Sequence, residues 1–162
     1  RIDHVHRAVC AATAAGVTLV AAAGNDAEDA ANYHPAAYPE VIAVSALADS
    51  DGRPGGLGPP PACLAGSLDD HLAFFSNFGS VVDIAAPGVC ISSTYPGGRY
   101  ATSSGTSFAA PLVAGAAALL KARNPSWSPQ TIRQQLLTTA ETGPIPGDPD
   151  AFSEGVLNVS SY

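Results

Sequence analysis

Residues 103–123 read SSGTSFAAPLVAGAAALLKAR. Apolar residues lie on nearly all sides of the helix that this stretch predicts, with Leu112 on one side and Val113 on the other. A helix of this kind belongs in the core of a protein. Pro111 and Gly115 interrupt the stretch, which is shorter than the ~20 apolar residues that a membrane span needs. We therefore expect a buried helix and no membrane partner.

Short apolar runs elsewhere in the chain predict the strands of a mainly parallel sheet. The run VTLVAAA is continuous, as expected for a strand buried on both faces. Apolar strands that alternate with helices predict a three-layer α/β fold. The segment at about 48–72 is rich in Pro, Gly and polar residues and is interpreted as a surface insertion. The expected elements are a helix over about 3–15, strands over 17–23, 41–47, 81–88 and 90–95, a turn at Gly97-Gly98, and a helix that begins at Ser128-Pro129.

Composition narrows the possible partners. The 162 residues are 46% hydrophobic and 13% charged, which is enough for one core and too apolar for a disordered tail. A net charge of −7 without a basic run argues against nucleic acid as a partner. Neither GxGxxG nor a phosphate-binding Gly-Lys-Ser/Thr motif occurs, which excludes a nucleotide-binding module.

Three cysteines are present, and none belongs to a CxxC motif, so a zinc or thioredoxin-type site is not expected. Cys63 in the insertion and Cys90 at a strand start form the candidate disulfide, with Cys10 as the odd thiol. The opening RIDHVHR lacks the basic and apolar segments of a signal peptide, and a start inside a domain would explain this.

Ser107 and Asn25 are the candidate chemical groups. Ser107 lies at the start of the long helix, where unpaired amides and the positive helix end favour a developing oxyanion. The alternative role for Ser107 is a simple N-cap. Asn25 follows Gly24 at the end of an apolar strand, and its alternative role is that of an ordinary turn residue.

Two motifs resemble those of the subtilisin family. GTSFAAPLVAG (105–115) resembles the family's nucleophile motif, usually GTSMA followed by Ser or Ala, Pro and HVAG. Phe108 and Leu112 stand where the family has Met and His, and neither position performs the chemistry. VTLVAAAGN (17–25) resembles the strand that ends in the family's oxyanion-hole asparagine. The resemblance covers most of the chain outside 48–72.

The resemblance implies a secreted serine endopeptidase that cleaves polypeptides through an acyl-enzyme on Ser107, with Asn25 stabilising the oxyanion. The family's Asp-Thr-Gly and His-Gly-Thr motifs are absent, which implies that the catalytic Asp and His lie upstream of residue 1. Residues 1–162 are then the C-terminal portion of the catalytic domain, inactive without its N-terminal half. The four histidines lack the family's flanking residues and are expected to be non-catalytic: His4, His6, His34 and His71.

The alternative function is a non-catalytic interaction protein derived from a subtilase. The sequence upstream of Arg1 discriminates the two, because only the enzyme requires the Asp and His motifs.

The resemblance also implies a substrate pocket and a metal site. The chemistry requires no cofactor, but the carbonyls of Pro39 and Val41 with the carboxylate of Asp83 could ligate a structural calcium ion. A solvated or backbone-bonded Asp83 is the alternative. The implied pocket residues are Ala22, Ala23 and Gly24 in one wall, Tyr33 partly filling the floor, and Pro35, which with His34 takes the place of the family's cis X-Pro bond.

Overall fold

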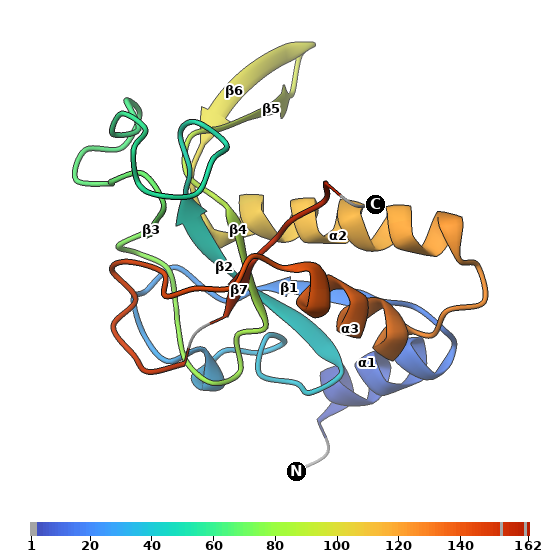
Figure 1. The fold of residues 1–162 in the computed structure, drawn as a ribbon. Helices are drawn as coiled ribbons and strands as arrows, with labels where there is room; N and C mark the ends of the chain where they lie inside the picture. Colours follow the sequence, from blue (N-terminus) through green and yellow to red (C-terminus); the bar gives the residue numbers. More distant parts are fainter. Residues whose placement is uncertain (1–2, 153, 161) are drawn as a thin grey trace.

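The computed structural model describes residues 3–152, 154–160 and 162. Its elements in chain order are α1 (His4–Ala14), β1 (Leu19–Ala22), the 3-10 helix η1 (Ala30–Asn32), β2 (Val41–Ala48), β3 (His71–Leu72), β4 (Ile84–Pro87), β5 (Ile91–Tyr95), β6 (Arg99–Ser103), α2 (Thr106–Arg123), α3 (Pro129–Thr139) and β7 (Gly155–Val156) (Figure 1). The main sheet has the order β1-β2-β4-β7, all parallel, and β3 pairs antiparallel with β2. This confirms the predicted α/β class with a mainly parallel sheet.

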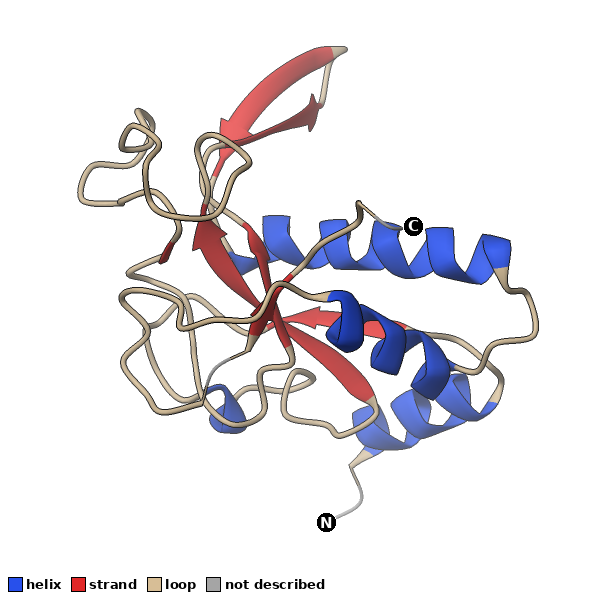
Figure 2. Ribbon diagram, viewed as in Figure 1, coloured by secondary structure: helices blue, strands red, loops and turns tan. Residues whose placement is uncertain are grey.

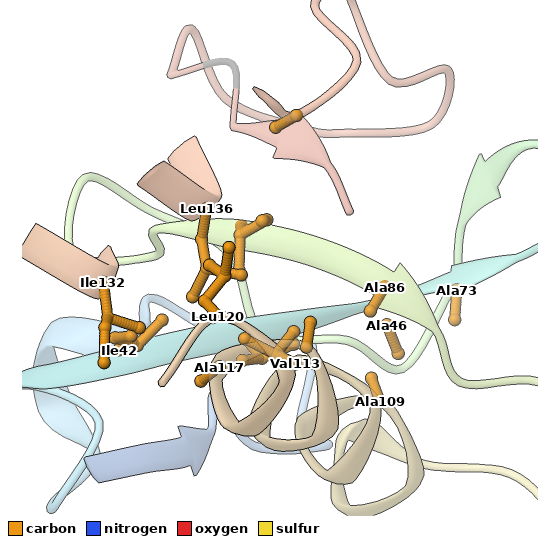
Figure 3. Close-up of a cluster of buried hydrophobic side chains, with 14 of the residues drawn as sticks. Ile42, Ala46, Ala73, Ala86, Ala109, Val113, Ala117, Leu120, Ile132 and Leu136 are labelled. Atoms are coloured by element: carbon orange, nitrogen blue, oxygen red, sulfur yellow. The ribbon is translucent and has the colours of Figure 1, made fainter. Parts of the chain in front are cut away.

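The main core lies between the sheet and α2. Alternate residues of β2, such as Ile42 and Ala46, face the same side because side chains alternate along a strand. Val113 and Leu120 of α2 pack against this face, and Ile132 of α3 joins them (Figure 3). All eight residues of β2 are buried, so β2 is the central strand on which the other elements are placed.

Helix α2 is buried on one side only, which corrects the expectation of a helix surrounded by core. Val113 is 0% exposed, whereas Leu112 is 40% and Leu119 is 53% exposed. The sequence periodicity is apolar on both sides, but no segment of the described chain covers the side that carries Leu112 and Leu119. An apolar helix face therefore remains accessible.

Strand β1 was also expected to be buried on both faces, and this was wrong. All four of its residues are only partly buried. β1 pairs with β2 alone and forms an edge of the described sheet, so it lacks a neighbouring strand on its other side.

The other expected boundaries agree closely with the structure. Asp3 caps α1, and Ser128 caps α3 by accepting from the Thr131 N–H at 3.1 Å. β4 is shorter than the predicted 81–88, because the Val82 N–H donates to Gly79 in a turn before the strand begins.

Two segments project from the main sheet. Residues 49–70 contain no helix or strand, and β3 follows them at the end of the segment that was predicted to be an insertion (Figure 2). β5 and β6 form an antiparallel hairpin whose turn contains Gly97 and Gly98, with φ of 84° and 70°. Among the described residues, no helix is both long enough and apolar enough to cross a membrane.

Candidate active site

Ser107 is the second residue of α2 and is exposed to solvent. The N-cap is Gly105, with φ 150° and without a side-chain hydrogen bond, so the simple capping role considered for Ser107 is wrong. Phe108 N–H donates to the Gly105 carbonyl at 2.9 Å. Within the described chain neither the Ser107 hydroxyl nor its N–H has a hydrogen-bond partner. Both groups are thus available at the positive end of the helix.

The side chain of Asn25 is attached to the start of this helix. Its Oδ1 accepts from the Thr106 N–H at 2.8 Å and from the Thr106 hydroxyl at 3.0 Å. The same hydroxyl accepts from the Gly24 N–H at 3.2 Å. Because Oδ1 is engaged twice while Nδ2 has no partner among the described residues, the amide donors of Asn25 remain available beside Ser107.

Thr106 was missed by the sequence reasoning, although it lies inside the quoted motif. Its side chain is fully buried and joins the end of β1 to the start of α2. Its position directly before Ser107 was the feature of the sequence that could have indicated this role. Its partners, however, lie 81 and 82 positions away along the chain.

Asn77 was also missed, and it shapes the backbone around Asn25. It is fully buried, and its Nδ2 donates to the Ala23 carbonyl at 3.0 Å. Its Oδ1 accepts from the N–H groups of Asp26 and Glu28 at 2.9 and 3.1 Å. One side chain therefore binds the backbone on both sides of Asn25 and positions it.

We expect Asn77→Ala to lower the free energy of unfolding by about 3 kcal/mol, because three hydrogen bonds are lost and the buried Ala23 carbonyl stays unpaired. Urea unfolding of the purified chain measures this. Asn32→Ala, at an exposed asparagine of η1, is the matched control and should change stability by less than about 0.5 kcal/mol. A loss below about 1 kcal/mol for Asn77→Ala would show that water replaces its bonds at little cost.

The residues expected to form the substrate pocket are only partly brought together. The Tyr33 ring lies 3.3 Å from where a Cβ on Gly24 would stand, so these two residues are neighbours. Tyr33 donates its hydroxyl proton to Glu28 at 2.8 Å, which raises the pKa of Tyr33 to about 12. Ala23 is fully buried, and Ala22 is partly buried in β1. Pro35 is exposed and follows a cis bond from His34, as the resemblance implied.

Two of the expected calcium ligands, Pro39 and Asp83, are bound by a guanidinium group. Arg133 of α3 donates to the Pro39 carbonyl at 2.6 Å and forms an ion pair with Asp83 Oδ1. Asp83 Oδ2 accepts from the Ala43 N–H at 2.9 Å. Two of the three proposed donors, Val41 being the third, are thus engaged by a fixed positive charge. The arrangement does not fit a calcium ion.

Arg133→Ala should destabilise the chain by about 3 kcal/mol at pH 7, because the largely buried Asp83 carboxylate loses its counter-charge. This value is at the lower end of the destabilisation that follows when a buried ion pair loses one partner, because the Arg133 side chain is 33% exposed. Burial raises the pKa of Asp83, against the hydrogen bonds from Ala43 and Arg133 that lower it. Removing Arg133 raises the pKa of Asp83 further. The loss of stability in the variant is therefore complete at a pH above the pKa of Asp83 in its folded state, and it becomes smaller as falling pH protonates Asp83.

Urea unfolding at pH 7 and pH 4 measures both effects, with Arg123→Ala at an exposed arginine as the control. An equal loss at both values of pH would contradict the role assigned to Asp83. Calcium should leave the melting temperature of the wild-type chain unchanged. A calcium-induced rise would show that the carbonyl and carboxylate donors bind the ion despite Arg133.

The candidate disulfide is confirmed and lies next to Ser104, which precedes α2. Cys63 and Cys90 are bonded, with their Cα atoms 5.8 Å apart, and Cys10 is a free, exposed thiol. Ser104 accepts from the Cys90 N–H at 3.0 Å. The disulfide therefore joins the 49–70 segment to the start of β5 beside residues that lead into Ser107.

No histidine hydrogen-bonds to Ser107 in the part of the chain that the structure describes. His6 contacts Glu40, His34 stacks on Tyr38, and His71 Nδ1 lies 2.9 Å from the Asp69 carbonyl. The nucleophile candidate thus has the unpaired amide of Asn25 nearby but no positioned base among these residues.

Comparison with known proteins agrees with this geometry. A model of the Subtilase family matches residues 1–158. Subtilisin BL of Lederbergia lenta is 40% identical over 157 residues, covering 97% of this chain and 50% of that protein. Subtilisin amylosacchariticus of Bacillus subtilis subsp. amylosacchariticus is 37% identical over 153 residues, covering 93% of this chain and 34% of that protein.

Solved structures show the same relationship. A cold-adapted subtilisin-like serine proteinase superposes with a TM-score of 0.79 at 32% identity, covering 98% of this chain and 50% of that chain. A protease from Pseudoalteromonas arctica superposes with a TM-score of 0.77 at 30% sequence identity. The match covers 96% of this chain and 44% of that chain. These structures confirm the three-layer subtilisin-like fold, and the chain spans half or less of the length of the relatives described. With the family model matching residues 1–158 and identities reaching 40%, the chain belongs to the subtilase family.

Proposed function

We propose that this chain supplies the nucleophile and the oxyanion donor of a serine endopeptidase. The observation that carries the proposal is the attachment of Asn25 to Thr106, which holds an unpaired amide donor beside the exposed Ser107. Acyl transfer requires a nucleophile and an oxyanion donor around one carbonyl group. The relatives' names as subtilisins and proteases support the same reaction.

In the proposed reaction the Ser107 Oγ attacks the carbonyl carbon of a peptide bond, and its proton passes to a histidine from outside this chain. The Asn25 amide and the Ser107 N–H donate hydrogen bonds to the oxyanion. The C–N bond then breaks, the amine leaves with the proton, and an acyl-enzyme remains on Ser107. Water, activated by the same base, hydrolyses the ester. No cofactor takes part.

We infer that the partner of this chain is the N-terminal half of the same catalytic domain, with a catalytic Asp and His. Two surfaces support this pairing: the exposed apolar side of α2 with Leu112 and Leu119, and the half-buried edge strand β1. The half-length match to the relatives agrees with it. The disulfide between Cys63 and Cys90 favours an oxidising, extracellular location.

Covalent labelling tests this assignment. A fluorophosphonate probe should label Ser107 rapidly when the segment encoded before Arg1 is added back, in cis or as a folded fragment. The 162-residue chain alone should react slowly, because a serine hydroxyl is a poor nucleophile without a base. Rapid labelling of the isolated chain would place a base within it. An upstream segment without Asp and His motifs would favour the non-catalytic interaction protein.

A further inference from the structure

Three side chains that can bind a metal ion lie close together: His6 and Cys10 on α1, and Glu40 directly before β2. His6 Nε2 lies 2.9 Å from Glu40 Oε2, and Cys10 Sγ lies 3.5 Å from Glu40 Oε1. The nitrogen, sulfur and oxygen ligand atoms all lie within 4.8 Å of one another. With zinc bonds of about 2.0–2.3 Å, the ligand atoms of a tetrahedral site are about 3.5 Å apart. Small side-chain rotations therefore suffice to place all three around one ion.

The local structure holds two of these ligands in position before any ion binds. His6 and Cys10 are four residues apart on α1 and so share one face of the helix. The His6 ring stacks on Tyr38, with ring centres 4.4 Å apart and planes within 4°. Tyr38 in turn donates to Asp3 at 2.6 Å, and Asp3 is the N-cap of α1. The imidazole is thus oriented by packing against a tyrosine that is itself anchored to the helix.

Charge and access also suit a divalent ion. A Cys10 thiolate and the Glu40 carboxylate supply two negative charges, and the neutral imidazole completes a set of three different donors. A surface cavity of about 540 Å³ borders Cys10 and Glu40 and leaves room for a solvent molecule as fourth ligand. Lys121 also lines this cavity, but its ammonium group donates to the Trp127 carbonyl at 2.7 Å.

We propose that His6, Cys10 and Glu40 bind one divalent transition-metal ion of borderline softness, Zn²⁺ or Co²⁺. Thiolate and imidazole ligands favour such ions over Ca²⁺ and Mg²⁺, which prefer oxygen ligands. Binding releases the thiol proton to solvent and forms the metal–sulfur bond. The ion ties α1 to the start of β2. The sequence spacing did not suggest this site, because Glu40 lies 30 positions from Cys10.

Cobalt titration of the purified 162-residue chain tests the proposal. One Co²⁺ per chain should produce a thiolate-to-cobalt charge-transfer absorption, which Zn²⁺ abolishes by displacement. Zn²⁺ should also slow the reaction of Cys10 with a disulfide reagent at least tenfold. This second readout needs no variant, because Cys63 and Cys90 are bonded to each other and Cys10 is the single free thiol. Absence of both effects would overturn the proposal.

Variants then identify the ligands. Cys10→Ala should remove the charge-transfer band, and His6→Ala or Glu40→Gln should weaken Co²⁺ binding at least about tenfold, since even outer-shell changes cost that much. His4→Ala on the same helix is the matched control and should leave affinity within twofold, because His4 is outside the cluster. A band that survives Cys10→Ala, or an equal loss with His4→Ala, would overturn the assignment. Far-ultraviolet circular dichroism verifies that each variant is folded.

Discussion

Ser107→Ala is expected to reduce kcat of the complemented enzyme by about 10⁶-fold, which is the size of the effect that removing the nucleophile has in subtilisin itself. The physical reason is that alanine has no oxygen with which to form the acyl-enzyme, so the two-step pathway through an ester disappears. The residual rate should come from oxyanion stabilisation and substrate binding alone. Hydrolysis of an unstructured protein, followed in excess substrate, measures the loss.

Ser103→Ala is the matched control for this variant. Ser103 is an exposed serine at the end of β6, four residues before Ser107, and it has no role in the proposed reaction. Its substitution should leave kcat within twofold. If Ser107→Ala kept more than about a tenth of the activity, another residue would be the nucleophile. The isolated chain, with or without Ser107, should show no turnover above background.

Asn25→Ala in the complemented enzyme should lower kcat by about 10²–10³, again a magnitude known from the corresponding experiment on subtilisin. KM should change little, because the oxyanion exists only during the reaction and its donor stabilises the transition state more than the bound substrate. Steady-state kinetics on a short peptide substrate separate the two constants.

Asn25→Asp distinguishes oxyanion stabilisation from a purely structural role. An aspartate keeps an oxygen that accepts from the Thr106 N–H and hydroxyl, but it has no amide N–H to donate. We expect it to be at least as inactive as Asn25→Ala, because its negative charge also opposes the developing oxyanion. Activity of Asn25→Asp close to wild type would mean that residue 25 acts only by anchoring the start of α2.

Local patterns in the sequence were sufficient for much of the fold. Helix α1 begins and ends, and helix α3 begins, close to the expected residues because caps and apolar spacing are local signals. The pairing of Cys63 with Cys90 was also predicted correctly from their places in the insertion and at a strand start. The apolar pattern of α2 was read correctly, but its burial was not. Periodicity reports which faces are apolar and not which neighbours cover them.

The candidate calcium site shows a feature that local sequence patterns could not predict. Pro39 and Asp83 were correctly placed near each other, yet the cation between them belongs to Arg133 of α3. Asp83 and Arg133 are 50 positions apart, and no motif connects them. An arginine on a helix surface has many possible partners. Only the packing of α3 beside β2 and β4 selects this one.

By itself the sequence determined the order of α1, α2 and α3 and of β1, β2, β4 and β5, but not the short strands β3 and β7. It also determined the disulfide and the residues proposed for chemistry, Ser107 and Asn25. These features depend on neighbouring residues or on short motifs. The tertiary structure decided how Thr106 and Asn77 hold Asn25, and which residues meet in the His6, Cys10 and Glu40 cluster. Hydrogen bonds and metal coordination require atoms within about 2–3.5 Å of one another. That proximity arises when strands and helices distant along the chain pack together.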